Sequence, residues 1–145
     1  MKINGFWLPY SFVSALKSNA LSRTCGSWNL KTNSDAFGHY LETEIGEVWA
    51  TEEKIRERTL NLPVSFKVDG CYGKQSEYFN EPGFIDDITD FSNIVEFAIS
   101  GDGASFCFDY RSNISNPEVI WWDDVYWRKI SNSYDEFISL FDTGS

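Results

Sequence analysis

The residues best suited to chemistry are one histidine and three cysteines. His39 is the only imidazole, and the thiols of Cys25, Cys71 and Cys107 include no C-x-x-C pair. A nucleophilic pair would need one of these thiols within hydrogen-bond reach of His39, and the sequence leaves that arrangement open. Because Cys107 stands between two phenylalanines, a small buried thiol is the simpler interpretation, and we expect His39 to hold a hydrogen-bonded structural position. The sequence therefore predicts no catalytic residue, no metal site and no cofactor.

Paired carboxylates are the second kind of candidate chemistry. Asp109 and Asp123 could lie on neighbouring strands, where two carboxylates can share acid–base work. A further group of aspartates lies between residues 86 and 90, but it lacks the D-x-[DN]-x-[DN]-G spacing of a calcium-binding EF-hand loop. We expect Asp109 to cap the following turn or to pair with Arg111. A small hydrolase that combines such carboxylates with His39 remains an alternative.

The chain is strongly acidic, with 22 Asp and Glu against 12 Lys and Arg and a formal net charge of −10. No acidic residue precedes Asp35, whereas the segment from Gln75 to Tyr110 holds eight acidic residues and no basic one. Proteins that bind nucleic acids neutralise phosphates with clustered Lys and Arg, which this composition lacks. The charge therefore predicts a basic protein partner and no nucleic acid. The alternative is that the acidity only keeps the chain soluble.

The elements that would position these residues begin with a helix. Pro9 suits a first helical turn, and the apolar residues after it recur on one helical face, which predicts a helix that ends near Asn19. Residues 37–50 are expected to be extended, and Thr51 can cap a short helix over EEKIRER. Prolines and glycines are predicted to break residues 59–93 into short strands and loops.

The pattern is clearest in the C-terminal third. Apolar alternation over 94–99 and 106–110 predicts two half-buried strands, joined by a hairpin turn at SGDG. VIWWDDV and YWRKI are expected to be two further strands, and SNSYDEFISLF a helix with a capping box formed by Ser133 and Glu136. The sequence predicts an α+β fold, with a mostly antiparallel mixed sheet and flanking helices at both ends, in a single domain over residues 1–145.

The compartment is suggested by what the sequence lacks. An odd number of cysteines without framework spacing is typical of reduced thiols in the cytoplasm. Polar residues and Pro9 interrupt the apolar stretch near the start, and no longer apolar run follows. We therefore expect a cytoplasmic protein that has no membrane contact.

Several short motifs together resemble one family. GDGASFCFDYR, PEVIWWDD and ISNSYDEFISLF follow one another in the order found in the SUKH superfamily, and LPYSFVSALK and EIGEVWATEEKI resemble its earlier helix and strand. The resemblance implies a mixed sheet wrapped by helices. In most bacterial members it also implies an immunity protein that neutralises a toxin, often a nuclease, whereas other members are eukaryotic scaffolds that regulate cell-wall synthesis.

The binding surface of that family differs with the partner, so the candidate docking residues come from this chain's own charge and aromatic patterns. We expect the charges to come from Glu77, Glu81, Asp86, Asp87 and Asp90, and the aromatic anchors from Tyr78, Phe84, Trp121 and Trp122. If the strand is regular, one of the two adjacent tryptophans must face inward. A scaffold or regulatory module with a non-toxin partner remains an alternative, and the oligomeric state stays open.

Overall fold

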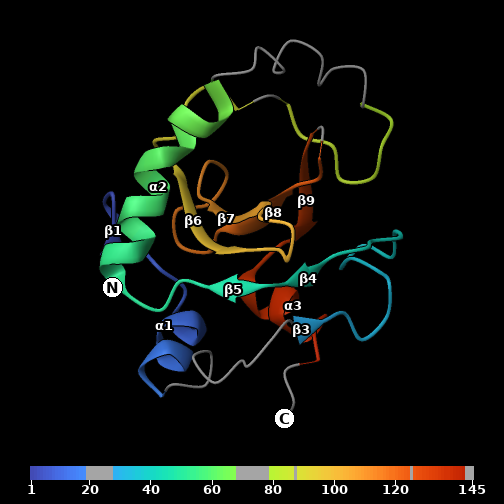
Figure 1. The fold of residues 1–145 in the computed structure, drawn as a ribbon, viewed down its shortest axis with the longest axis horizontal. Helices are drawn as coiled ribbons and strands as arrows, with labels where there is room; N and C mark the ends of the chain where they lie inside the picture. The colour runs from blue at the N-terminus through green and yellow to red at the C-terminus, as the bar shows by residue number, and fades with distance from the viewer. Residues whose placement is uncertain (19–27, 68–78, 87, 125, 143–145) are drawn as a thin grey trace.

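A five-stranded antiparallel sheet forms the centre of the molecule (Figure 1). The computed structural model describes residues 1–18, 28–67, 79–86, 88–124 and 126–142. The sheet order is β5–β6–β7–β8–β9, and two short ladders pair β1 with β2 and β3 with β4. In chain order the elements are β1 Lys2–Ile3, β2 Phe6–Trp7, α1 Tyr10–Lys17, β3 Trp28–Asn29, β4 Glu44–Ile45, β5 Glu47–Val48, α2 Glu52–Lys67, β6 Ile94–Ile99, β7 Ser105–Asp109, β8 Glu118–Trp122, β9 Trp127–Ser131 and α3 Tyr134–Ser139. The predicted α+β class is confirmed.

The central strands lie where the alternation predicts them, but their burial differs from the expectation. Phe106 and Phe108 pack into one apolar cluster, whereas Cys107 between them packs into a second. Since successive side chains of a strand point to opposite faces, the two clusters lie on opposite faces of the sheet. All of β7 is buried. The prediction of half-buried strands was therefore wrong, because helices cover both faces.

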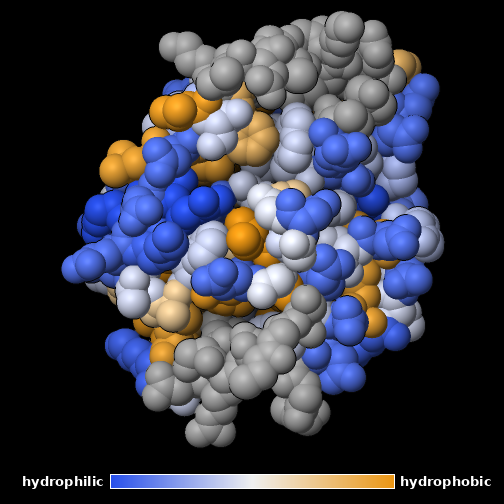
Figure 2. Space-filling model, viewed as in Figure 1, coloured by the Kyte–Doolittle hydropathy of each residue, from blue (hydrophilic) through white to orange (hydrophobic). Residues whose placement is uncertain are grey.

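Helix α2 covers one of these faces and is longer than the sequence predicts. Thr51 caps the N-terminus of α2 as expected, with its Oγ1 accepting a hydrogen bond from the Lys54 amide at 3.1 Å. The helix then continues through Pro63, where we expected a break. A proline inside a helix costs about 3 kcal/mol, and the burial of Leu62 and Phe66 against the sheet offsets that cost. The outer face of α2 is hydrophilic towards its N-terminal end and hydrophobic towards its C-terminal end (Figure 2).

Helices α1 and α3 cover the opposite face (Figure 1). Pro9 is the N-cap of α1, and Phe12 from this helix makes an edge contact with Phe97 of β6, their ring centroids 5.5 Å apart. The capping box of α3 is confirmed, because the Ser133 hydroxyl accepts a hydrogen bond from the Glu136 amide at 3.2 Å. Both terminal helices thus form where their sequence signals place them.

The outer edge of the sheet, at β9, is covered by two loops. The Lys129 amide donates to the Gly83 carbonyl at 2.8 Å, and the Ile85 amide donates to the Trp127 carbonyl at 3.2 Å. Further along the strand, the Ala36 amide donates to the Ile130 carbonyl at 3.1 Å. These bonds occupy backbone groups that would otherwise form an exposed strand edge. They also attach both loops to the sheet, and the two loops build the site described below.

Gly83 is required for this attachment, and replacing it with alanine is expected to destabilise the fold. Its φ is +68°, and a Cβ at this position would lie 2.5 Å from the carbonyl oxygen of Lys129. Positive-φ strain and overpacking together should lower the free energy of unfolding by about 3 kcal/mol. Gly103→Ala is the matched control, because Gly103 has a φ of +89° but nothing within 4 Å of its Cβ position. Urea unfolding that gives equal losses for both variants would contradict the close approach.

Candidate protein-docking surface

A buried ion pair holds three segments of the chain together beside β9. Arg128 is 4% exposed, and its Nη2 donates to Asp35 Oδ2 at 2.9 Å and to the Tyr40 carbonyl at 2.7 Å. Its Nη1 donates to Asp123 Oδ2 at 3.3 Å. The Asp35 carboxylate also accepts backbone hydrogen bonds through Oδ1, from the Phe37 amide at 2.8 Å and from the His39 amide at 3.0 Å. The guanidinium thus fixes the loop around Tyr40 against the turn between β8 and β9.

Above this ion pair lies a groove of about 500 Å³. We name it the acidic groove, and it is lined by Tyr40, Glu81, Pro82, Asp123, Asp124 and Tyr126, with Arg128 beneath them. Its three carboxylates come from two segments that are far apart in the sequence. Tyr40 is 64% exposed, whereas Tyr126 is 5% exposed.

The two tyrosines of the acidic groove stay neutral at physiological pH. Burial, together with the charge of Asp123, raises the pKa of Tyr126 to about 12. Its hydroxyl donates to the Pro82 carbonyl at 3.0 Å. A hydrogen bond from the Tyr40 hydroxyl to Glu42 Oε2, at 3.2 Å, raises the pKa of Tyr40. The acidic groove therefore combines uncharged aromatic rings with carboxylates, which is a surface that attracts ammonium and guanidinium groups.

The structure brings only part of the sequence-predicted docking set to this groove. Glu81 lines it, and Phe84 stacks on Tyr126 at a centroid distance of 6.2 Å. Trp121 instead lies in the core, 6% exposed and stacked on Phe106. Trp122 is half-buried on the opposite face of the sheet. Trp122, but not Trp121, is therefore accessible to a partner.

The remaining predicted acids lie outside the acidic groove. Asp86 and Asp90 are exposed. Hydrogen bonds to Asp109 chiefly raise the pKa of Arg111, and the charges of Asp109, Glu118 and Asp86 add to this effect. A hydrogen bond from the Ser92 amide lowers the pKa of Asp90. Glu77, Tyr78 and Asp87 lie outside the described residues.

Sequence reasoning did not predict Tyr40 or Asp124 as docking residues, and it considered Asp123 only as a catalytic carboxylate. The Asp-Asp pair directly after a strand could have signalled a turn that presents charge, since Asp124 adopts a φ of +62° that aspartate tolerates. Tyr40 has no such local signal. Its position depends on the hydrogen bond between its carbonyl and Arg128, 88 residues away in the chain.

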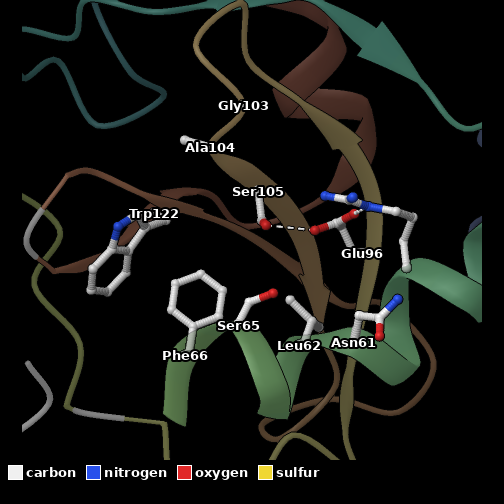
Figure 3. Close-up of a pocket in the computed structure, with 10 residues that line it drawn as sticks. Asn61, Leu62, Ser65, Phe66, Glu96, Gly103, Ala104, Ser105 and Trp122 are labelled. Atoms are coloured by element: carbon white, nitrogen blue, oxygen red, sulfur yellow. Dashed lines mark hydrogen bonds and ion pairs between the residues drawn. The ribbon is translucent and has the colours of Figure 1, made fainter. Parts of the chain in front are cut away.

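A second site lies on the other face of the sheet, where a buried carboxylate collects three donors. Glu96 is 1% exposed and accepts from Arg58 Nε at 2.6 Å, from Trp49 Nε1 at 2.9 Å and from Ser105 Oγ at 2.5 Å. The Arg58 guanidinium also lies over the Trp49 ring, 5.0 Å from its centroid. A pocket of about 120 Å³ opens next to this network (Figure 3). We name it the α2 pocket.

Of the residues first considered for catalysis, the structure describes His39 and Cys107. The His39 side chain is 54% exposed, and its Nδ1 lies 3.9 Å from Asp35 Oδ2, beyond hydrogen-bond distance, so the expected hydrogen-bonded position of this imidazole is not found among the described residues. Cys107 is fully buried, and burial, followed by the charges of Glu96 and Asp109, raises the pKa of its thiol well above the ordinary value. Cys25 and Cys71 lie outside the described residues. No group of three or more His, Cys, Asp or Glu in the described part of the chain could hold a metal ion.

The predicted partner of Asp109 is confirmed. The Arg111 guanidinium donates from Nε to Asp109 Oδ1 at 3.0 Å and from Nη2 to Oδ2 at 2.8 Å. In the register of β7 against β8, Asp109 lies opposite Glu118 at the start of β8, whereas Asp123 follows the end of β8. The two aspartates are therefore not the acid–base pair considered from the sequence.

This fold, with two solvent-open recesses and a strong excess of carboxylates, defines an acidic α+β domain suited to binding proteins. The family model described as SMI1 / KNR4 family (SUKH-1) matches residues 2–140, and the chain belongs to this family. SUKH proteins are immunity proteins and regulators, so the family implies a protein partner. No curated protein and no solved structure matches the chain. None of the described helices has the length and apolar composition needed to cross a bilayer.

Proposed function

We propose that this chain is a cytoplasmic immunity protein of a bacterium, which binds and neutralises a toxin protein through its acidic surface. Membership of the SUKH-1 family supports a protein partner. The acidic groove is the observation that carries the proposal, because it presents carboxylates and an exposed tyrosine in one concave surface. The carboxylates and aromatic rings of the acidic groove can bind Lys and Arg side chains. Such binding requires no reaction centre.

The electrostatics favour a toxin whose own active site is basic. A nuclease must hold phosphates in a positively charged cleft, and carboxylates placed over that cleft would compete with the substrate. The net charge of −10 would speed the encounter with such a protein, while the few desolvated contacts at the centre would determine how long the complex lasts. Toxicity would then be blocked by occupation of the cleft or of a site beside it.

The test is a rescue experiment with the toxin-like domain encoded beside the gene for this chain. Cells that express that domain alone should stop growing, and co-expression of this chain should restore growth. The two proteins should also co-purify as a stable complex. Growth arrest that persists despite soluble expression of this chain, with no complex formed, would contradict the proposal. A stable complex with an endogenous, non-toxin protein would instead favour a scaffold function.

A further inference from the structure

The α2 pocket lies between helix α2 and the hairpin that joins β6 to β7. Figure 3 shows Ser65, Leu62 and Asn61 rising from α2, Gly103 and Ala104 on the hairpin opposite, and the Ser105 to Glu96 hydrogen bond at one end. The rings of Phe66 and Trp122 form one wall, with their centroids 4.9 Å apart. The pocket therefore has an aromatic wall and a polar end.

The polar groups at this pocket are only partly used. Glu96 accepts three side-chain hydrogen bonds, and Nε is the guanidinium nitrogen of Arg58 that donates to it. Three polar groups at this pocket have no hydrogen-bond partner among the described residues. They are the Asn61 amide, the Ser65 hydroxyl and the Nη groups of Arg58. The α2 pocket thus has hydrogen-bond donors and acceptors available to a bound side chain, next to the aromatic wall.

The size of the α2 pocket limits a bound side chain to a single ring. Its volume of about 120 Å³ is close to that of an apolar protein cavity of about 150 Å³ that admits benzene. A lysine or arginine would approach the positive charge of Arg58, and a carboxylate would approach Glu96 within an acidic chain. A phenylalanine would cover the unused polar groups without pairing them, at a cost of about 1–3 kcal/mol for each one buried. A phenol can both donate and accept.

We propose that the α2 pocket receives a tyrosine side chain of the partner protein. This inference rests on the proposed function, which supplies a protein partner, and it adds a second contact to the acidic groove. Trp122 lines the α2 pocket, and the next two residues, Asp123 and Asp124, line the acidic groove. A partner that straddles the β8–β9 turn therefore fills both recesses, with a basic side chain on one face of the sheet and a tyrosine on the other.

The test uses the free protein and p-cresol, which is the side chain of tyrosine, with toluene as the probe that lacks the hydroxyl. NMR titration should shift the Trp122 indole and Ser65 amide signals with a dissociation constant of about 1–10 mM for p-cresol. Toluene should bind roughly tenfold more weakly, because it leaves the polar groups unpaired. Signals from the acidic groove, such as the Tyr126 amide, should stay unchanged.

Ser65→Leu fills the pocket and should abolish the p-cresol shifts, whereas Val64→Leu, on an exposed position of the same helix, should leave them intact. Absence of shifts at saturating p-cresol, equal binding of toluene, or unchanged binding to the Ser65→Leu variant would each overturn the proposal. Since no toxin is present, such a failure would leave the rescue result untouched. Successful titration combined with failed rescue would contradict the proposed function alone.

Discussion

Arg128→Met is expected to lower the free energy of unfolding by about 3–5 kcal/mol, as measured by urea denaturation. The side chain of Asp35 is fully buried and that of Arg128 is 5% exposed, so the substitution leaves a carboxylate in the interior without its cation. It also removes the donor that holds the Tyr40 carbonyl at 2.7 Å. Loss of that bond should loosen the loop that forms one side of the acidic groove, so partner binding should weaken as well.

A double variant separates the buried charge from simple loss of packing. Asn in place of Asp35 keeps an oxygen that can accept the Phe37 and His39 amides but carries no charge. Adding Asp35→Asn to Arg128→Met should therefore recover part of the lost stability. Lys129→Met is the surface control, because its ion pair with Glu118 is partly exposed and worth at most about 1 kcal/mol. Equal losses of unfolding free energy for Arg128→Met and Lys129→Met would contradict a stabilising role of the buried ion pair between Arg128 and Asp35.

Local patterns in the sequence predicted the elements whose signals lie within a few residues. The alternation of β6 and β7, the turn at SGDG and the capping box at Ser133 all depend on neighbours in the chain, and each is confirmed. Helix α2 shows where such signals fail. Proline is unfavourable inside a helix, so the sequence predicts a break at Pro63, but packing of Leu62 and Phe66 against the sheet favours a continuous helix.

The candidate site was less predictable than the fold, because it is assembled across long distances in the sequence. Glu81 was predicted from the acidic bias alone, whereas Tyr40 reaches the same groove only through Arg128. Glu96 lies on the strand over 94–99, which the sequence predicted to be half-buried. It is buried instead, because α2 brings Arg58 over that face to pair with it. Periodicity predicts which side chains share a face, but it does not predict what covers that face.

The second large effect is expected from reducing the charge of the acidic groove. The variant Glu81→Lys with Asp124→Asn raises the net charge by three and leaves Asp123, which pairs with Arg128, in place. Asparagine is chosen at position 124 because it tolerates the φ of +62° there. Association with the toxin domain should slow by roughly 10-fold to 100-fold at low salt, because the steering field at the docking point is weakened.

A control with the same change in net charge shows whether position matters. Glu53 and Asp135 are exposed acids on α2 and α3, outside the acidic groove. Glu53→Lys with Asp135→Asn should slow association by less than about threefold, since distant exposed charges are screened by salt. Comparable slowing in both variants would assign the effect to net charge rather than to the acidic groove.

The most direct measurement is the association rate of the unaltered chain and of the groove variant with the toxin domain, as a function of ionic strength. Between about 0.01 M and 1 M salt the Debye length falls from about 30 Å to about 3 Å. A carboxylate-lined docking point predicts a steep fall in rate for the unaltered chain and a much flatter dependence for the variant. Identical rates and identical salt dependence would show that the partner binds elsewhere.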